Sequence, residues 1–150
     1  MNTCQPLRVA IIGTGARADY LYAPLLQALP GEAGLVSIWG RNPESARRLG
    51  ESLGVPWYTA LDRMMRETAP QVGIVCVNKH ANGQVGLMAV EHGLHVLLET
   101  PIAHKLSEAD AIIAAAARRG LQEIILAIRQ SALEGGRPVR LPLDPTAQRV

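Results

Sequence analysis

The stretch LRVAIIGTGARA, residues 7–18, joins an apolar run to a glycine-rich turn. Residues 7–12 are apolar apart from Arg8 and rich in β-branched side chains, so they predict a strand buried on both faces. The next residues match G-x-G-x-x-A, in which Gly13 permits a tight turn and Gly15 leaves room for a diphosphate. A small residue at the third position, Ala18, lets the following helix pack closely against the strand. The stretch therefore predicts a strand, a phosphate-binding turn and a helix.

The amide N–H groups that begin a helix after such a turn attract phosphate oxygens. The pattern alone is weak evidence, but it becomes specific when it lies between a buried strand and a helix at the start of an alternating array. The same residues would also suit a tight turn that binds nothing. We expect contacts to a dinucleotide from the turn residues Gly13, Thr14, Gly15, Ala16 and Arg17.

Apolar runs and helical patterns alternate along the chain up to residue 120. We expect strands over 7–12, 35–39, 55–58, 72–77 and 95–99, and helices over 16–29, 43–54, 61–68, 82–91 and 107–119. Asn42 and Pro43 suit the start of a helix. Ser107 with Asp110 approximates a capping box. Strand–helix alternation with short links predicts a doubly wound parallel α/β sheet, a Rossmann fold.

Residues 121–150 depart from this alternation. We therefore divide the chain into a Rossmann dinucleotide-binding domain (1–120) and a short C-terminal helix–strand extension (121–150). Apolar spacing over 122–133 favours an amphipathic helix, and residues 139–143 resemble an edge strand. The apolar run 121–128 would also suit a sixth strand of the sheet.

The composition is typical of a soluble globular domain, with 48% hydrophobic and 19% charged residues and a net charge of +2. This balance lacks the basic footprint of a nucleic-acid-binding protein. The longest apolar run, 111–117, is far shorter than the about 20 residues that span a bilayer. No export leader is visible at the N-terminus, and two cysteines cannot build a disulfide framework. We expect a cytoplasmic protein without nucleic-acid or membrane partners.

The four histidines and Cys76 carry side chains that could have a functional role. His92 and His95 have no cysteine or carboxylate at ligand spacing, so no metal site is expected. His80 and His104 are expected at the carboxyl edge of the strands, where an acid–base role is the alternative to ordinary hydrogen bonding. Cys76 lies within an apolar run and is expected to be a core residue.

The end of the second expected strand bears on the choice of nucleotide. NAD-selective Rossmann domains place an acidic residue there to accept the ribose hydroxyl bonds. This chain has Gly40, Arg41 and Asn42 instead. A glycine leaves room for a 2′-phosphate, and an arginine can bind it bidentately. The sequence therefore favours NADP(H) over NAD(H), unless Arg41 is only a solvated loop charge.

Four motifs, in order and at matching spacing, resemble the glucose-fructose oxidoreductase and inositol dehydrogenase (Gfo/Idh/MocA) family. They are GTGARA (13–18), VCVN (75–78), AVEHG (89–93) and HVLLETP (95–101). The resemblance covers about residues 7–120. It implies hydride transfer between a nicotinamide and a sugar, inositol or similar polyol, in a protein with a second, C-terminal α/β domain.

Two signatures of this family are altered here. The family's Glu-Lys-Pro reads Glu99-Thr100-Pro101, so the residue usually tied to catalysis is a threonine. A hydroxyl cannot replace an ammonium in holding a substrate oxygen or assisting proton transfer. Lys79 is the lysine closest to the expected crevice. The candidate catalytic residues are therefore Thr100 and Lys79, and the resemblance also implies a cis bond before Pro101.

The second altered signature is the family's Pro-Asn-x-x-His, which lines the nicotinamide side. In this chain the Pro and His positions are Asn78 and Asn82. The resemblance implies that further cofactor contacts come from Val77, Asn78, Asn82, Glu99 and Pro101.

The length of the chain separates two hypotheses about function. Members of the family are more than twice as long, and residues 123–143 resemble the helix and strand that close them. We therefore expect a member reduced in size, active as an NADP(H)-dependent oxidoreductase on a sugar-like or carbonyl substrate. The alternative is a non-catalytic nucleotide-binding module or regulatory subunit. In either case residues 123–143 are expected at a homodimer interface, because they suit surface that a lost domain would expose.

Overall fold

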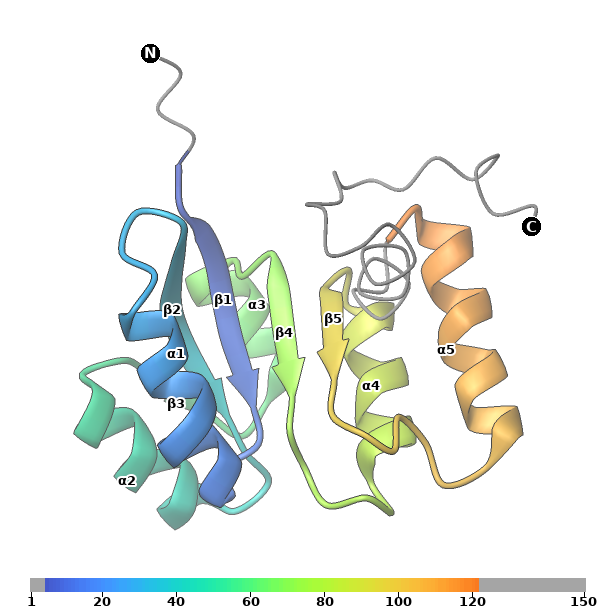
Figure 1. The fold of residues 1–150 in the computed structure, drawn as a ribbon, viewed down its shortest axis with the longest axis horizontal. Coiled ribbons are helices and arrows are strands. Elements are labelled where there is room, and N and C mark those ends of the chain that lie inside the picture. Colours follow the sequence, from blue (N-terminus) through green and yellow to red (C-terminus); the bar gives the residue numbers. More distant parts are fainter. Residues whose placement is uncertain (1–4, 122–150) are drawn as a thin grey trace, which may run out of the picture.

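Five parallel strands form one sheet in the order β3-β2-β1-β4-β5 (Figure 1). The structure, a computed structural model, describes residues 5–121. The strands are β1 (Leu7–Ile12), β2 (Ala33–Trp39), β3 (Trp57–Tyr58), β4 (Val72–Val75) and β5 (His95–Leu98). This arrangement confirms the doubly wound α/β prediction.

Helices cover both faces of the sheet. They are the π-helical turn η1 (Ala18–Tyr22), α1 (Ala23–Gln27), α2 (Pro43–Leu53), α3 (Leu61–Thr68), α4 (Asn82–Glu91) and α5 (Leu106–Arg119). Successive side chains of a strand point to opposite faces. Val9 and Ile11 accordingly pack with η1, α1 and α2, whereas Ala10 and Ile12 pack with α3, α4 and α5. Each face of β1 therefore belongs to a separate core, and the strand is buried from Val9 to Ile12.

The structure confirms the helix start at Asn42 and corrects the one at Ser107. The side chain of Asn42 accepts a hydrogen bond from the Ser45 N–H at 3.0 Å, and α2 begins at Pro43. Helix α5 begins at Leu106, before the expected cap. The carboxylate of Glu108 accepts the N–H groups of His104 at 3.2 Å and Lys105 at 3.4 Å. The capping box predicted for Ser107 and Asp110 is wrong, because the longer Glu108 side chain reaches back to these earlier amides.

The helix expected directly after the glycine turn begins with the wider turn η1. The N–H of Ala23 bonds to the carbonyl of Ala18, five residues earlier. Pro24, which follows, has no N–H to give to the carbonyl of Tyr20. Such wider turns are frequent at functional sites, and this one begins where the glycine turn ends.

The strand order places a topological switch point between β1 and β4. From β1 the chain continues through α1 to β2 on one side, and β4 pairs with β1 on the other. Loops that follow β1 and β4 diverge there and leave a crevice at the carboxyl ends of the strands, where ligands bind in open α/β sheets.

The segment 122–150 lies outside the described residues. The helix or strand predicted for it, and self-association through 123–143, stay predictions. Within residues 5–121, none of the helices is both long and apolar enough to cross a membrane.

Candidate nucleotide-binding site

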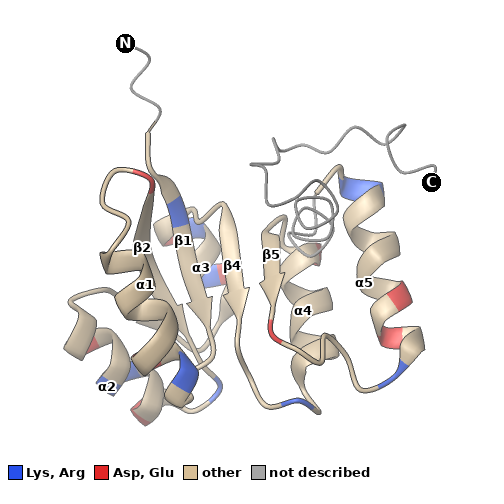
Figure 2. Ribbon diagram, in the orientation of Figure 1, with Lys and Arg blue, Asp and Glu red and all other residues tan. Residues whose placement is uncertain are grey.

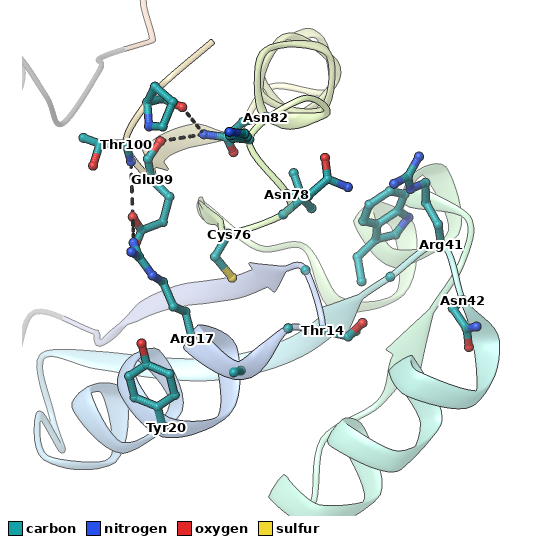
Figure 3. Close-up of a pocket in the computed structure, with 18 residues that line it drawn as sticks. Thr14, Arg17, Tyr20, Arg41, Asn42, Cys76, Asn78, Asn82, Glu99 and Thr100 are labelled. Atoms are coloured by element: carbon teal, nitrogen blue, oxygen red, sulfur yellow. Dashed lines mark hydrogen bonds and ion pairs between the residues drawn. The ribbon is translucent and has the colours of Figure 1, made fainter. Parts of the chain in front are cut away.

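A pocket of about 800 Å³ opens at the carboxyl ends of the strands (Figure 3). Its wall comes from the loops that follow β1, β2, β4 and β5, which lie next to one another in the sheet. All predicted site residues line it: Gly13, Thr14, Gly15, Ala16, Arg17, Gly40, Arg41, Asn42, Val77, Asn78, Lys79, Asn82, Glu99, Thr100 and Pro101. The structure thus brings together every residue singled out from the sequence as a candidate contact.

The glycine turn forms the centre of the pocket floor. Gly13 has a φ of +137°, and a Cβ there would lie 2.5 Å from the main-chain oxygen of Cys76. A Cβ on Gly15 would meet nothing within 4 Å, and Gly15 also lines the pocket. The two glycines therefore have different roles. Gly13 is required by the fold, whereas no protein atom opposes a side chain at Gly15.

The wall beyond β2 is uncharged except for Arg41. A Cβ on Gly40 would lie 2.6 Å from Cγ2 of Thr14, so the residue holds β2 close to the glycine turn. Arg41 is exposed, and within the described residues it forms no ion pair. The side chain of Asn42 already caps α2. Arg41 is therefore available to an anionic group at this end of the pocket.

The opposite end of the pocket is built around the carboxylate of Glu99, directly after β5. Arg17 pairs with Oε2 of Glu99, and the hydroxyl of Tyr22 donates to Oε1 at 2.5 Å. The Thr100 N–H also donates to Oε2, at 3.2 Å. Burial alone would raise the pKa of Glu99, but the hydrogen bonds from Tyr22 and Arg17 and the charge of Arg17 outweigh it and hold that pKa below its ordinary value. The carboxylate is therefore ionised at neutral pH.

Charges in the pocket lining favour an anionic ligand. Basic residues lie in loops at the carboxyl ends of the strands (Figure 2), and Glu99 directly follows β5. Because Arg17 neutralises Glu99, the charges of Arg41 and Lys79 are left uncompensated among the residues that line the pocket. A diphosphate or a further phosphate group would meet a positive field here.

Asn82, the first residue of α4, fixes the main chain after β5. Its Nδ2 donates to the carbonyl oxygens of Glu99 at 2.5 Å and Pro101 at 2.9 Å. The residue is 1% exposed, and its Oδ1 is buried without a hydrogen-bond partner. The peptide bond between Thr100 and Pro101 is cis, as the resemblance implied. Asn82 thus holds the turn 99–101 in place while one of its own atoms stays unsatisfied.

The two candidate catalytic residues lie at the rim of the pocket, and both are exposed. Lys79 belongs to the loop after β4, and Thr100 to the turn after β5. The rings of His80 and His104 lie edge to face with centroids 4.7 Å apart, but neither residue lines the pocket. This ring contact joins the loops after β4 and β5 outside the pocket lining.

Three residues that line the pocket were not among the predicted contacts: Tyr20, Trp39 and Cys76. Cys76 was expected in the core, and it is buried at 6% exposure. Burial raises the pKa of its thiol to about 12, so it is not a thiolate at neutral pH. The sequence did indicate that two of them would line the pocket, because Trp39 ends β2 and Cys76 directly follows β4, at the same sheet edge as the glycine turn.

Among residues 5–121, no cluster of three or more His, Cys, Asp or Glu side chains has an arrangement that could hold a metal ion. His92 instead contacts Oδ1 of Asp62 on α3 at 2.9 Å and the Met88 carbonyl at 2.7 Å. The pocket lining itself carries three basic side chains, Arg17, Arg41 and Lys79, and the single carboxylate of Glu99.

Comparisons with known proteins agree with this geometry. The family model described as oxidoreductase family, NAD-binding Rossmann fold, matches residues 7–126. An uncharacterized oxidoreductase of Schizosaccharomyces pombe is 26% identical over 118 residues, which cover 77% of this chain and 32% of that protein. The D-glucoside 3-dehydrogenase of Escherichia coli is 33% identical over 100 residues, which cover 66% of this chain and 28% of that protein.

A solved structure with the same fold is that of a 3-ketoreductase from Actinomadura kijaniata, in complex with NADP and TDP-benzene. It is 27% identical, with a TM-score of 0.70 over 88% of this chain and 43% of that chain. The chain spans about a third of the length of the curated relatives it matches. Because the family model covers all five strands and the whole pocket lining, the chain belongs to the Gfo/Idh/MocA family of oxidoreductases.

Proposed function

We propose that the pocket binds a nicotinamide dinucleotide, with the diphosphate at the turn 13–17 and the nicotinamide toward β4 and β5. The observation that carries this proposal is that Gly15, in the glycine turn, lines the pocket and has nothing within 4 Å of a Cβ position. In a Rossmann domain this position lets the main chain approach the diphosphate. When bound, the nicotinamide would supply or accept a hydride. The substrate class we propose is sugar-like or carbonyl compounds, in line with the glucoside dehydrogenase and the ketoreductase among the similar proteins.

A matched pair of glycine variants tests the binding proposal. In Gly15→Val the new side chain would fill the diphosphate position while touching no protein atom within 4 Å of its Cβ. The control is Gly34→Val, at a β2 glycine that also has nothing within 4 Å and does not line the pocket. We expect both variants to keep the wild-type melting temperature within a few degrees, and only Gly15→Val to lose NADPH binding in a fluorescence titration. Equal affinity in the two variants would refute the proposal.

We further propose that the pocket prefers NADP(H) to NAD(H). Support comes from the uncompensated charge of Arg41, the missing side chain at Gly40 and the lack of an acidic residue at the end of β2. In Arg41→Ala the Kd for NADPH should rise by about tenfold, in the range typical of a charge-assisted hydrogen bond, while the Kd for NADH stays nearly constant. A parallel rise for both nucleotides would contradict this preference.

For catalysis we propose that Lys79 takes the place of the family's lysine and that Thr100 contributes a hydrogen bond to substrate. Both residues line the pocket at the loops after β4 and β5. The ammonium of Lys79 could hold a substrate oxygen and transfer a proton, whereas the hydroxyl of Thr100 could donate only a hydrogen bond near neutral pH. In Lys79→Met, NADPH oxidation with a panel of sugars, inositols and aldehydes should fall at least tenfold. Lys105→Met, an exposed lysine outside the pocket, is the control.

A second function is favoured by the state of Glu99. Its carboxylate is fully engaged by Arg17, Tyr22 and the Thr100 amide, and Thr100 carries no group that titrates near neutrality. The chain would then be a nucleotide-binding module or regulatory subunit without turnover. Tight NADPH binding together with no oxidation of NADPH in the presence of the whole substrate panel would support this function over the enzyme.

A further inference from the structure

Two imidazole side chains, those of His80 and His104, lie together just outside the pocket lining. His80 belongs to the loop after β4, and His104 belongs to the loop after β5. Their rings are in edge-to-face contact with centroids 4.7 Å apart, and both residues are exposed. Lys79, the residue before His80, does line the pocket. This imidazole pair therefore borders the rim of the pocket on the side of β4 and β5.

The ring nitrogens of the imidazole pair are not used by the fold. Within residues 5–121 they have no hydrogen-bond or ion-pair partner. The ring of His92 is different, because its two nitrogens contact the Met88 carbonyl at 2.7 Å and Oδ1 of Asp62 at 2.9 Å. An imidazole carries at least one N–H donor whether it is neutral or protonated. The pair thus offers unused donors from two loops at one place.

The charge around the imidazole pair is positive. Among the described residues, the ammonium of Lys79 has no ion-pair partner. The carboxylate of Glu108 on α5 accepts the N–H groups of His104 at 3.2 Å and Lys105 at 3.4 Å. Its Oε2 would lie 2.7 Å from a Cβ on Gly83, so it is held against α4, and its charge is offset by that of Lys105. An anion would therefore meet a favourable field at the pair.

The position of the pair determines which part of a bound molecule would reach it. The phosphates of the nucleotide are proposed at the turn 13–17 and at Arg41, which follow β1 and β2. Strands β4 and β5 lie on the other side of β1, where the nicotinamide is proposed. Hydride transfer needs the reacting carbon of the substrate beside the nicotinamide. The part of the substrate that crosses this rim of the pocket would then meet the imidazole pair.

We infer that His80 and His104 form a subsite for an anionic oxygen group, a phosphate or a carboxylate, that the substrate carries away from its reacting carbon. The inference rests on the proposed function, and it narrows the substrate class to phosphorylated or acidic sugar-like compounds. The two imidazoles would donate hydrogen bonds to the anionic oxygens, while Lys79 adds positive charge and keeps its proposed role at the reacting oxygen. Binding a remote group in this way holds the reacting carbon in place.

The test measures binding of four probes to the full chain saturated with NADP⁺. The probes are D-glucose 6-phosphate, D-gluconate, D-glucose and inorganic phosphate, and the readouts are calorimetry and the ring C–H signals of the histidines in NMR spectra. We expect glucose 6-phosphate or gluconate to bind at least tenfold more tightly than glucose, because two hydrogen bonds to a charged group are gained. The ring signals of His80 and His104 should shift, and those of His92 should not. The tighter of the two anionic probes distinguishes a phosphate from a carboxylate.

Matched phenylalanine variants test the two imidazoles. His80→Phe and His104→Phe each keep an aromatic ring for the edge-to-face contact and remove its N–H donors. Each should raise the Kd of the tighter anionic probe about fivefold, the size of one exposed hydrogen bond, and leave the Kd of glucose unchanged. His92→Phe makes the same chemical change at a ring that contacts Asp62 instead, and it should leave both Kd values unchanged.

Four results would overturn the inference. They are equal Kd values for glucose and both anionic probes, an equal loss of affinity in His92→Phe, unchanged affinity in both His80→Phe and His104→Phe, and shifts of the His80 and His104 signals that NADP⁺ alone produces. Inorganic phosphate that binds as tightly as both anionic probes would show an adventitious ion only and would also overturn it. If NADP⁺ does not bind the wild type, the proposed function is refuted, and the same titrations on the nucleotide-free chain still decide whether the imidazole pair binds an anion.

Discussion

Replacing Gly13 with alanine probes the contact that seats the glycine turn on the sheet. The added Cβ would lie 2.5 Å from the oxygen and 2.8 Å from the carbon of the Cys76 main chain, at a φ of +137°. Holding a side-chain-bearing residue in such a conformation costs of order 1–3 kcal/mol. Forcing an extra methyl into packed surroundings costs about 1–3 kcal/mol more. We therefore expect Gly13→Ala to lower the free energy of unfolding by about 4 kcal/mol.

Urea unfolding followed by far-UV circular dichroism measures this loss. With a urea slope of about 2 kcal/mol per molar, the midpoint of Gly13→Ala should fall by about 2 M. The control Gly34→Ala has open space around the Cβ and no positive φ. It should be neutral or slightly stabilising, because alanine reduces the freedom of the unfolded chain. Adding Cys76→Ala should not rescue Gly13→Ala, since the two nearest atoms are main chain. A loss below 1 kcal/mol, or rescue by the double variant, would refute this reasoning.

Two further predictions concern charge and capping. Folding lowers the pKa of Glu99, so its contribution to stability is complete above the ordinary pKa and is lost as the pH falls through the lower pKa of the folded state. Urea midpoints measured from pH 7 down to pH 3 should therefore fall less steeply in Glu99→Gln than in the wild type, and equal slopes would contradict the assignment. Asn42→Ala removes the cap of α2 and should cost about 1 kcal/mol in the same assay, whereas an unchanged midpoint would show that the cap is not needed.

The sheet and the residues that line the pocket could be predicted, because both follow from the order of strands and helices along the chain. Parallel strands that alternate with helices bring all their carboxyl ends to one edge. Residues placed directly after strands, such as Gly13, Arg41 and Glu99, must then meet there whatever their side chains do. The helix cap at Asn42 was equally readable, because its partner lies three residues away.

The contacts within the pocket could not be predicted, because they depend on side-chain direction. Arg17 was expected as a possible phosphate contact in the glycine turn, yet its guanidinium pairs with Glu99, 82 residues later. Nothing in the spacing of the sequence indicates that an arginine on the loop after β1 reaches past β4 to the end of β5. The start of α5 was missed for a related reason, since Glu108 reaches back to the N–H groups of His104 and Lys105 and the helix begins before Ser107.

The turn 99–101 is held from two sides before any ligand arrives. Arg17 and Tyr22 bind the Glu99 carboxylate from the side of the glycine turn, and Asn82 binds the main chain from the start of α4. A wall fixed in this way needs little ordering on binding, which favours affinity for the nucleotide. The same bonds make Glu99 a weaker general base, because they hold its pKa below the ordinary value and occupy both carboxylate oxygens. Under the proposed function, a proton exchanged with substrate would then come from another group of the pocket lining, such as Lys79 or Tyr20, or from solvent, so the contacts that would favour nucleotide binding are not the ones that would carry turnover.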